Sequence, residues 1–184
     1  MCKHDLQYMR IAKIWSENSH ANRHKVGAII VKNNAIISDG YNGMPAGFNN
    51  CCEIYEPDLT GEACYKKALA ADPRGIGCEG CCHTELINWE AKPVCLYADK
   101  CKFAKSTTKP EVLHAEANAI TKLAKSTQSS DGATLYVTMS PCIECAKLII
   151  QAGIKKVYYD EIYRNVDGLE LLKRAGIETE QIHI

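Results

Sequence analysis

The sequence predicts an α/β fold with three layers, in which a five-stranded mixed sheet lies between helices on both faces. A β-hairpin pattern comes first, within residues 26–38. From residue 114 onward, strand patterns alternate with helix patterns, and such alternation requires parallel strands joined by right-handed crossovers. With 184 residues, the chain is long enough for one well-buried domain. We therefore expect a single domain over residues 1–184, with a cysteine-rich insertion at about 48–110.

The N-terminal part predicts one helix and the hairpin. Asp5 can cap a helix whose apolar residues recur at roughly helical spacing until residues 18–19. The first strand follows at residues 26–32 and its partner at residues 35–38. Between them, Asn33-Asn34 is a two-residue turn in which both residues can take positive φ. These two strands should pair in antiparallel fashion.

Two stretches in the middle of the chain lack a regular pattern. Residues 39–47 place three glycines and a proline around an aromatic residue and an amide. Such a loop is either a plain turn or a place where the backbone approaches a ligand closely. Residues 48–110 contain one helix pattern, near 62–71, between turn signals. Because a structureless loop of this length is unusual in a compact domain, something should hold the insertion in place.

The C-terminal part predicts three helices and three strands. The helices are expected at 114–126, 141–152 and 168–175, and the strands at 133–138, 156–159 and 179–184. Pro141 suits the first position of the second helix, Ser140 can cap it, and Gly153 ends it. Asp167 caps the third helix and Gly176 ends it. Ligands of open sheets bind beyond the carboxyl ends of the strands, and the end of the strand at 133–138 leads directly to Cys142.

One histidine and two cysteines in this part form a candidate metal site. His114, Cys142 and Cys145 are ligands of the type that zinc prefers, and three protein ligands leave the fourth tetrahedral position open for water. Glu116 adds a carboxylate that can move protons without binding metal. Because residues two apart do not share a face of a helix, His114 must lie where the chain is still entering its helix. The plainer alternative is a core histidine and two small buried thiols.

The spacing of these residues is informative. His-x-Glu followed by Pro-Cys-x-x-Cys is typical of zinc nucleobase deaminases, whereas a lone Cys-x-x-Cys fits redox sites and structural zinc equally well. Each half of the pattern stands at the predicted start of a helix. The positive ends of two helices would therefore favour thiolate over thiol at one metal.

Composition narrows the function classes. Lys plus Arg and Asp plus Glu number 22 each, so the net charge is zero, which argues for a small substrate and against DNA or RNA. No segment has the apolar length of a membrane span, and residues 1–5 do not open a signal peptide. We therefore expect a cytosolic protein.

The insertion holds most of the cysteines. Of the 11 cysteines, eight lie between Cys51 and Cys101, and Cys78 and Cys81 have the Cys-x-x-Cys spacing. In a reducing compartment such a count indicates metal binding or buried thiols more than disulfides. A second, structural zinc ion is one reading and unliganded thiols are the other, because cysteine is often buried as a small hydrophobic residue. Which four residues would hold this zinc cannot be read from the spacing.

The order of the motifs points to a family. The stretches Val26-Gly27-Ala28, Gly40-Tyr41-Asn42-Gly43, 114–120 and 140–147, together with the run 146–155, resemble the deoxycytidylate (dCMP) deaminases of the cytidine deaminase superfamily. The cysteine-bearing insertion is similar to that of phage and bacterial members. The resemblance implies the cytidine-deaminase-like fold and hydrolytic deamination of dCMP to dUMP and ammonia, which feeds thymidylate synthesis.

The resemblance also implies roles for single residues. Glu116 would take a proton from the attacking water and deliver protons to N3 of the ring and to the departing amine. Asn42 matches the asparagine that contacts the deoxyribose, and Tyr163 matches an aromatic residue of the substrate pocket. The contacts to the 5′ phosphate correspond to Arg23, His24 and Lys25. These three basic residues could equally be a solvated edge.

Family members of this kind are commonly homohexamers that dCTP activates and that dTTP inhibits with Mg²⁺. The resemblance places their regulatory nucleotide at a loop that corresponds to Gly40, Tyr41, Asn42, Gly43 and Pro45. Phage members also carry a second zinc ion, whose ligands correspond to about His20, Cys51 and Cys101. The insertion differs from theirs in length and cysteine placement, and His20 stands where a cysteine is expected.

Two competing functions remain at this point. One is a zinc deaminase for another substrate, such as cytidine, guanine or a tRNA adenosine, although a tRNA enzyme should carry a basic surface. The other is a non-catalytic binding module stabilised by zinc, which would have no use for Glu116 beside an open coordination position.

Overall fold

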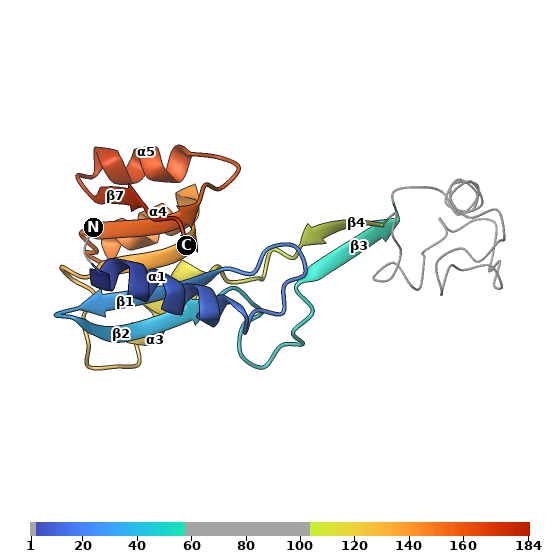
Figure 1. The fold of residues 1–184 in the computed structure, drawn as a ribbon. Helices are drawn as coiled ribbons and strands as arrows, with labels where there is room; N and C mark the ends of the chain where they lie inside the picture. The colour runs from blue at the N-terminus through green and yellow to red at the C-terminus, as the bar shows by residue number, and fades with distance from the viewer. Residues whose placement is uncertain (1–2, 58–103) are drawn as a thin grey trace, which may run out of the picture. The chain divides into compact units, whose positions relative to one another are not determined.

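The computed structural model describes residues 3–57 and 104–184 (Figure 1). The chain divides into two compact units. The first comprises Met1–Cys52 and Glu111–Ile184, and the second comprises Glu53–Pro110.

The first unit contains a mixed sheet. Among the described residues, five of its strands form this sheet in the order β2-β1-β5-β6-β7. The strands are β1 (Gly27–Lys32), β2 (Ala35–Tyr41), β5 (Thr134–Met139), β6 (Lys156–Glu161) and β7 (Glu178–Gln181). Strand β1 pairs antiparallel with both β2 and β5, and β5, β6 and β7 pair in parallel. The predicted arrangement of a hairpin followed by parallel strands is confirmed.

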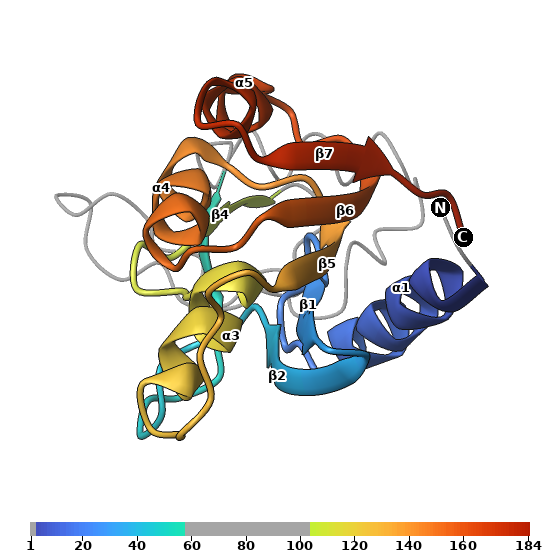
Figure 2. The same ribbon diagram turned by 90° about the vertical axis from the view of Figure 1, so that its left-hand side faces the viewer.

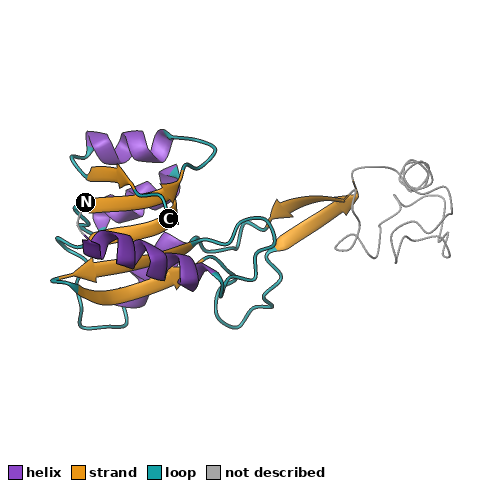
Figure 3. Ribbon diagram, in the orientation of Figure 1, coloured by secondary structure: helices purple, strands orange, loops and turns teal. Residues whose placement is uncertain are grey.

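Helices cover both faces of this sheet, so the three-layer prediction is also confirmed (Figures 2 and 3). Helix α1 (Lys3–Ser16) lies on one face, against β1, β2 and β5. The other face carries α3 (Ala115–Leu123), α4 (Ile143–Gln151) and α5 (Asp167–Arg174). None of the helices in the described part of the chain is long and apolar enough to cross a membrane.

The two faces receive alternate residues of each strand, as the two-residue period of a strand requires. In β1, Ile30 belongs to the cluster under α3 and α4, whereas Ile29 belongs to the cluster under α1. In β5, Val137 and Tyr136 divide between the faces in the same way. On the α1 face, the hydroxyl of Tyr136 donates a hydrogen bond to Asp5 at 2.8 Å.

The turns largely follow the predictions. Asn33 and Asn34 have φ of 51° and 60°, as the two-residue hairpin turn requires. Gly153 and Gly176 end α4 and α5 with φ of 73° and 75°, the left-handed conformation that glycine adopts without strain. The end of the hairpin differs, because β2 continues to Tyr41.

The longer β2 changes the role of Gly40, which was expected in a loop. A Cβ atom on Gly40 would lie 2.2 Å from the carbonyl oxygen of Ala115 and 2.6 Å from the backbone nitrogen of Ala119. Glycine is therefore required because strand β2 and helix α3 are in backbone contact here.

The insertion contains regular structure that the sequence pattern did not reveal. Strands β3 (Glu53–Pro57) and β4 (Ala104–Thr108) pair antiparallel, with Tyr55 opposite Ser106. Neither strand has a clear alternation of apolar and polar residues. The helix predicted near 62–71 and the Cys-x-x-Cys at 78–81 lie outside the described residues.

Candidate metal centre and substrate site

His114 stands immediately before helix α3. It is the N-cap residue, with extended φ and ψ of −72° and 156°, so the prediction that the chain is still entering the helix at this residue is confirmed. An isolated bridge holds the approach, since Leu113 and Gly43 exchange backbone hydrogen bonds of 2.9 and 3.1 Å. The extended backbone at His114 allows its ring and Glu116 to turn toward the same space, which a regular helix would prevent.

Cys142 and Cys145 lie at the start of helix α4, although not as predicted. The helix begins at Ile143 with Cys142 as its N-cap, so Pro141 is not its first residue and Ser140 does not cap it. Ser140 instead continues the β5–β6 ladder, because its backbone N–H donates to the carbonyl of Glu161 at 2.8 Å. Cys145 follows in the first turn of α4 and is buried.

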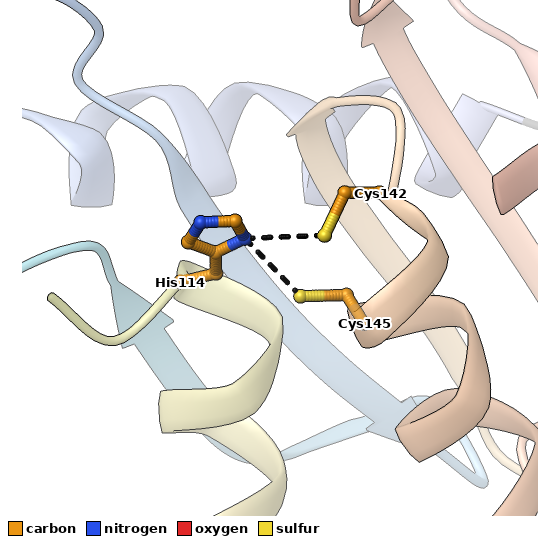
Figure 4. A group of neighbouring side chains, drawn as sticks. All are labelled: His114, Cys142 and Cys145. Carbon is orange, nitrogen blue, oxygen red and sulfur yellow. Dashed lines mark hydrogen bonds between the residues drawn. The ribbon is translucent and has the colours of Figure 1, made fainter. Parts of the chain in front are cut away.

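The structure brings His114, Cys142 and Cys145 together (Figure 4). His114 Nδ1 lies 3.4 Å from the Sγ atom of each cysteine, and the three candidate ligand atoms lie within 4.8 Å of one another. In a tetrahedral zinc site, Zn–N and Zn–S bonds of ordinary length separate nitrogen from sulfur by about 3.6 Å. The donor set therefore fits zinc in both chemistry and spacing.

The charges at this centre also favour metal binding. Hydrogen bonds with Cys145 and His114, of which the one with Cys145 has the larger effect, lower the pKa of Cys142 to about 3. Its partner shows the opposite shift, because the bond to Cys142 and burial both raise the pKa of Cys145. The lowered pKa of Cys142 favours its thiolate, which is the form of cysteine that ligates metals.

Glu116 lies in the first turn of α3 and is only 4% exposed. Burial raises the pKa of its carboxyl from 4.5 to about 7. A carboxyl that titrates near neutral pH can both accept and donate a proton under physiological conditions. Glu116 therefore has the position and the proton affinity expected of a group that shuttles protons beside the three candidate ligands.

Asn42 ties together the residues that precede β1. Its Oδ1 accepts a 2.8 Å hydrogen bond from the N–H of Val26, and its Nδ2 donates at 2.8 Å to the carbonyl of His24. The side chains of Arg23, His24 and Lys25 are exposed. The structure thus anchors the backbone of this basic segment while leaving its side chains in solvent.

Tyr163 lies just after β6, and its backbone N–H donates to Ser140 Oγ at 2.8 Å. This bond links the segment that carries Cys142 to the predicted aromatic residue of the substrate pocket. The guanidinium of Arg164 lies 5.4 Å from the centre of the Tyr163 ring, within the range of a cation–π contact. Sequence reasoning missed Arg164, and only its place beside Tyr163 could have indicated it.

The predicted regulatory loop begins within the sheet. Gly40 and Tyr41 belong to β2, and the carbonyl of Tyr41 accepts a 2.9 Å hydrogen bond from Asn118 of α3. A Cβ atom on Gly43 would touch nothing closer than the Tyr41 ring, at 3.9 Å. A side-chain carbon would therefore fit at Gly43 but not at Gly40.

The predicted ligands of a second zinc ion are only partly within the described chain. His20 and Cys51 are both exposed, and Cys101 lies outside the described residues. Within the described residues, the group of three or more potential ligands is that of His114, Cys142 and Cys145.

Comparison with known proteins identifies the family to which the chain belongs. The sequence model of the family described as "Cytidine and deoxycytidylate deaminase zinc-binding region" matches residues 2–161. The chain belongs to this deaminase family. Deoxycytidylate deaminase of Enterobacteria phage T4 is 41% identical over 175 residues, covering 92% of this chain and 85% of the phage protein. ComE operon protein 2 of Bacillus subtilis is 32% identical, covering 96% of this chain and 70% of its own length.

A solved structure agrees with the family assignment. The dCMP deaminase of cyanophage S-TIM5, crystallised in complex with dCMP and dUMP, superposes with a TM-score of 0.69 at 36% identity. The match covers 99% of each chain. The chain is therefore a deaminase with the cytidine-deaminase-like fold, and its family is a zinc-binding one.

Proposed function

We propose that this chain catalyses the hydrolytic deamination of dCMP to dUMP and ammonia and so supplies dUMP for thymidylate synthesis. The observation that carries the proposal is the buried Glu116 beside the compact group of His114, Cys142 and Cys145. Relatives that cover most of the chain are deoxycytidylate deaminases, and the cyanophage relative binds dCMP and dUMP. We treat residues 1–184 as one catalytic domain with an insertion at about 48–110.

The metal chemistry belongs to the three candidate ligands. His114, Cys142 and Cys145 would hold a zinc ion, which would supply an activated water as the nucleophile at neutral pH. Glu116 accepts a proton as the water attacks C4 of the cytosine ring, and it then delivers protons to N3 and to the departing amine. Burial of Glu116 supports this role, since the raised pKa near 7 lets one carboxyl serve as base and acid in turn.

Substrate contacts are assigned to Tyr163, to Asn42 and to the basic segment at residues 23–25. Tyr163 packs on the nucleotide, and Asn42 contacts the deoxyribose. The side chains of Arg23, His24 and Lys25 meet the dianionic 5′ phosphate, which requires charge-assisted hydrogen bonds. Their exposure and the anchoring of their backbone by Asn42 support a site where side chains close on a ligand that arrives from solvent.

Regulation is assigned to the loop of Gly40, Tyr41, Asn42, Gly43 and Pro45. We propose that dCTP activates and dTTP with Mg²⁺ inhibits a homohexamer through this loop. Asn42 is shared between the loop and the substrate contacts, so a nucleotide that reorganises the loop would bias substrate binding over a short distance.

Two further assignments complete the proposal. A second, structural zinc ion is held by His20, Cys51 and Cys101 together with the insertion. The enzyme works in the cytoplasm, which is the host cytosol if a phage carries the gene, because a reducing compartment preserves thiol ligands.

The test measures loss of the cytosine absorbance with dCMP, deoxycytidine and CMP in parallel, each with and without dCTP or dTTP. We expect selective turnover of dCMP that the triphosphates alter. Turnover of deoxycytidine alone would remove the phosphate role of Arg23, His24 and Lys25. Absence of turnover by zinc-loaded protein would favour a deaminase for another base or a binding module.

A further inference from the structure

The connection between β6 and α5, residues 161–168, runs along the segment that carries the first cysteine ligand. Three separate contacts join them. Ser140 donates its backbone N–H to Glu161 and accepts the N–H of Tyr163 at its Oγ, each at 2.8 Å. The third contact is that of Gly168 with Pro141 and Cys142.

The Gly168 contact leaves no room for a side chain. A Cβ atom there would lie 2.0 Å from the carbonyl oxygen of Pro141 and 2.8 and 2.9 Å from the carbonyl carbon and oxygen of Cys142. Gly168 does not have positive φ, so glycine is needed for this contact and not for its backbone conformation. The opposing atoms are backbone, and they cannot move aside without moving Cys142.

The carbonyl oxygen of Cys142 also accepts the hydrogen bond that begins helix α4. Cys142 O accepts the first intrahelical hydrogen bond, from the N–H of Ala146 at 2.9 Å. A displacement of this carbonyl would therefore disturb the first turn, which carries Cys145. Both thiols of the metal centre thus depend on a surface provided by Gly168.

Ser140 supplies the complementary contact. It is 2% exposed, and its hydroxyl accepts the N–H of Tyr163 where the backbone ladder between β5 and β6 has ended. The side chain thereby continues the ladder by one more hydrogen bond. As a result, Tyr163 is held in register with the segment that leads into Cys142.

We propose that residues 161–168 and Ser140 together form a template that fixes both the metal ligands and the substrate-facing aromatic residue, with Gly168 and Ser140 as the two positioning residues. Gly168 sets the position of Cys142 from one side by excluded volume. Ser140 sets the position of Tyr163 by its hydroxyl. The inference rests on the proposed metal site, although it does not depend on which nucleotide is deaminated.

The first experiment compares zinc affinity in Gly168→Ala, in Glu170→Ala and in the unaltered protein, by competition with a chromophoric chelator. Glu170 is exposed on the same helix, so its alanine variant controls for the new residue. Because alanine is the better helix former, Gly168→Ala would strengthen α5 if the contact did not matter. We expect instead a zinc affinity roughly ten- to a hundredfold weaker, with the control unchanged.

Two spectroscopic measurements separate positioning from general destabilisation. Circular dichroism of the metal-free variant should retain the native helix signal, while the visible absorption of the cobalt(II) form should change because it reports ligand geometry. Equal zinc affinity and an unchanged cobalt spectrum in Gly168→Ala would overturn the role of Gly168. Failure of the unaltered protein to bind zinc would instead overturn the proposed function, and this inference with it.

The second experiment leaves Gly168 unaltered and therefore tests the template even if Gly168→Ala does not fold. Hydrogen exchange of the Tyr163 amide is measured in zinc-loaded Ser140→Ala and Ser140→Thr. We expect exchange at least about tenfold faster in the alanine variant, because the amide loses its acceptor, and protection restored by threonine. Equal exchange in the alanine variant and the unaltered protein would overturn the template.

Discussion

The metal centre and the basic segment at residues 23–25 differ in how their side chains are held. The candidate metal ligands His114 and Cys142 are the N-cap residues of two helices, and backbone contacts fix their positions. The basic side chains are exposed, and their backbone is held mainly through the amide of Asn42. A metal needs its ligands in place before it binds, whereas a flexible cation can close on a phosphate after the substrate has arrived.

The largest effect is expected at the rigid centre. Replacing Glu116 with glutamine should lower turnover of dCMP by at least about 10³-fold, because one carboxyl serves as both base and acid. Zinc content should remain that of the unaltered protein, since Glu116 is not part of the group of three ligands. Steady-state rates and metal analysis of the same sample check both expectations. Turnover within tenfold of the original would show that Glu116 does not move the protons.

The same variant should show a pH-dependent gain in stability in metal-free protein. The pKa of Glu116 is raised by burial from 4.5 to about 7, so the unfolded chain ionises before the folded one does. Stability is therefore lost as pH rises from about 4.5 to 7, and Glu116→Gln escapes this loss. The free energy of unfolding of Glu116→Gln minus that of the unaltered protein should be about 3 kcal/mol larger above pH 7 than at pH 4.

Urea denaturation of both metal-free proteins across this pH range measures the difference. Taking the difference between the two proteins removes the titration of the groups that do not interact with Glu116. A difference that does not vary with pH would mean that Glu116 is solvated and ionised in the folded protein.

A smaller effect is expected where Asn42 anchors the backbone of the basic segment. Asn42→Ala should lower the free energy of unfolding by about 2 kcal/mol, because it leaves the N–H of Val26 and the carbonyl of His24 without their partner. The control is Asn18→Ala, which removes one exposed hydrogen bond and should change stability by less than about 0.5 kcal/mol. Urea denaturation of the zinc-loaded variants measures both, and equal values would show that the anchor is not needed.

The smallest effect is expected for the exposed cations themselves. Arg23→Ala and Lys25→Ala should each raise KM for dCMP about tenfold through loss of a charge-assisted contact. Lys25→Ala should leave the free energy of unfolding unchanged, and Lys125→Ala, at another exposed position, should change neither KM nor the free energy of unfolding. An unchanged KM in both variants would mean that Arg23 and Lys25 are ordinary solvent-exposed residues and do not bind the phosphate of dCMP.

Several features of the fold could be read from local patterns. The Asn33-Asn34 turn, the helix ends at Gly153 and Gly176 and the entry of His114 into its helix all depend on residues within one turn of each other. Strands β3 and β4 were missed because residues 53–57 and 104–108 lack a periodic apolar pattern, so only their pairing defines them. Long-range pairing of this kind leaves little local signal.

The sequence by itself determined the identity of the candidate ligands and of Glu116, because their residue types and short spacings carry the chemistry of a zinc deaminase. Only the tertiary structure decided what holds them. Ser140, expected to cap a helix, accepts the N–H of Tyr163, 23 residues away, and Gly168 lies against Pro141 and Cys142. Such contacts join segments that the folded sheet brings together, and no local preference of either segment specifies them.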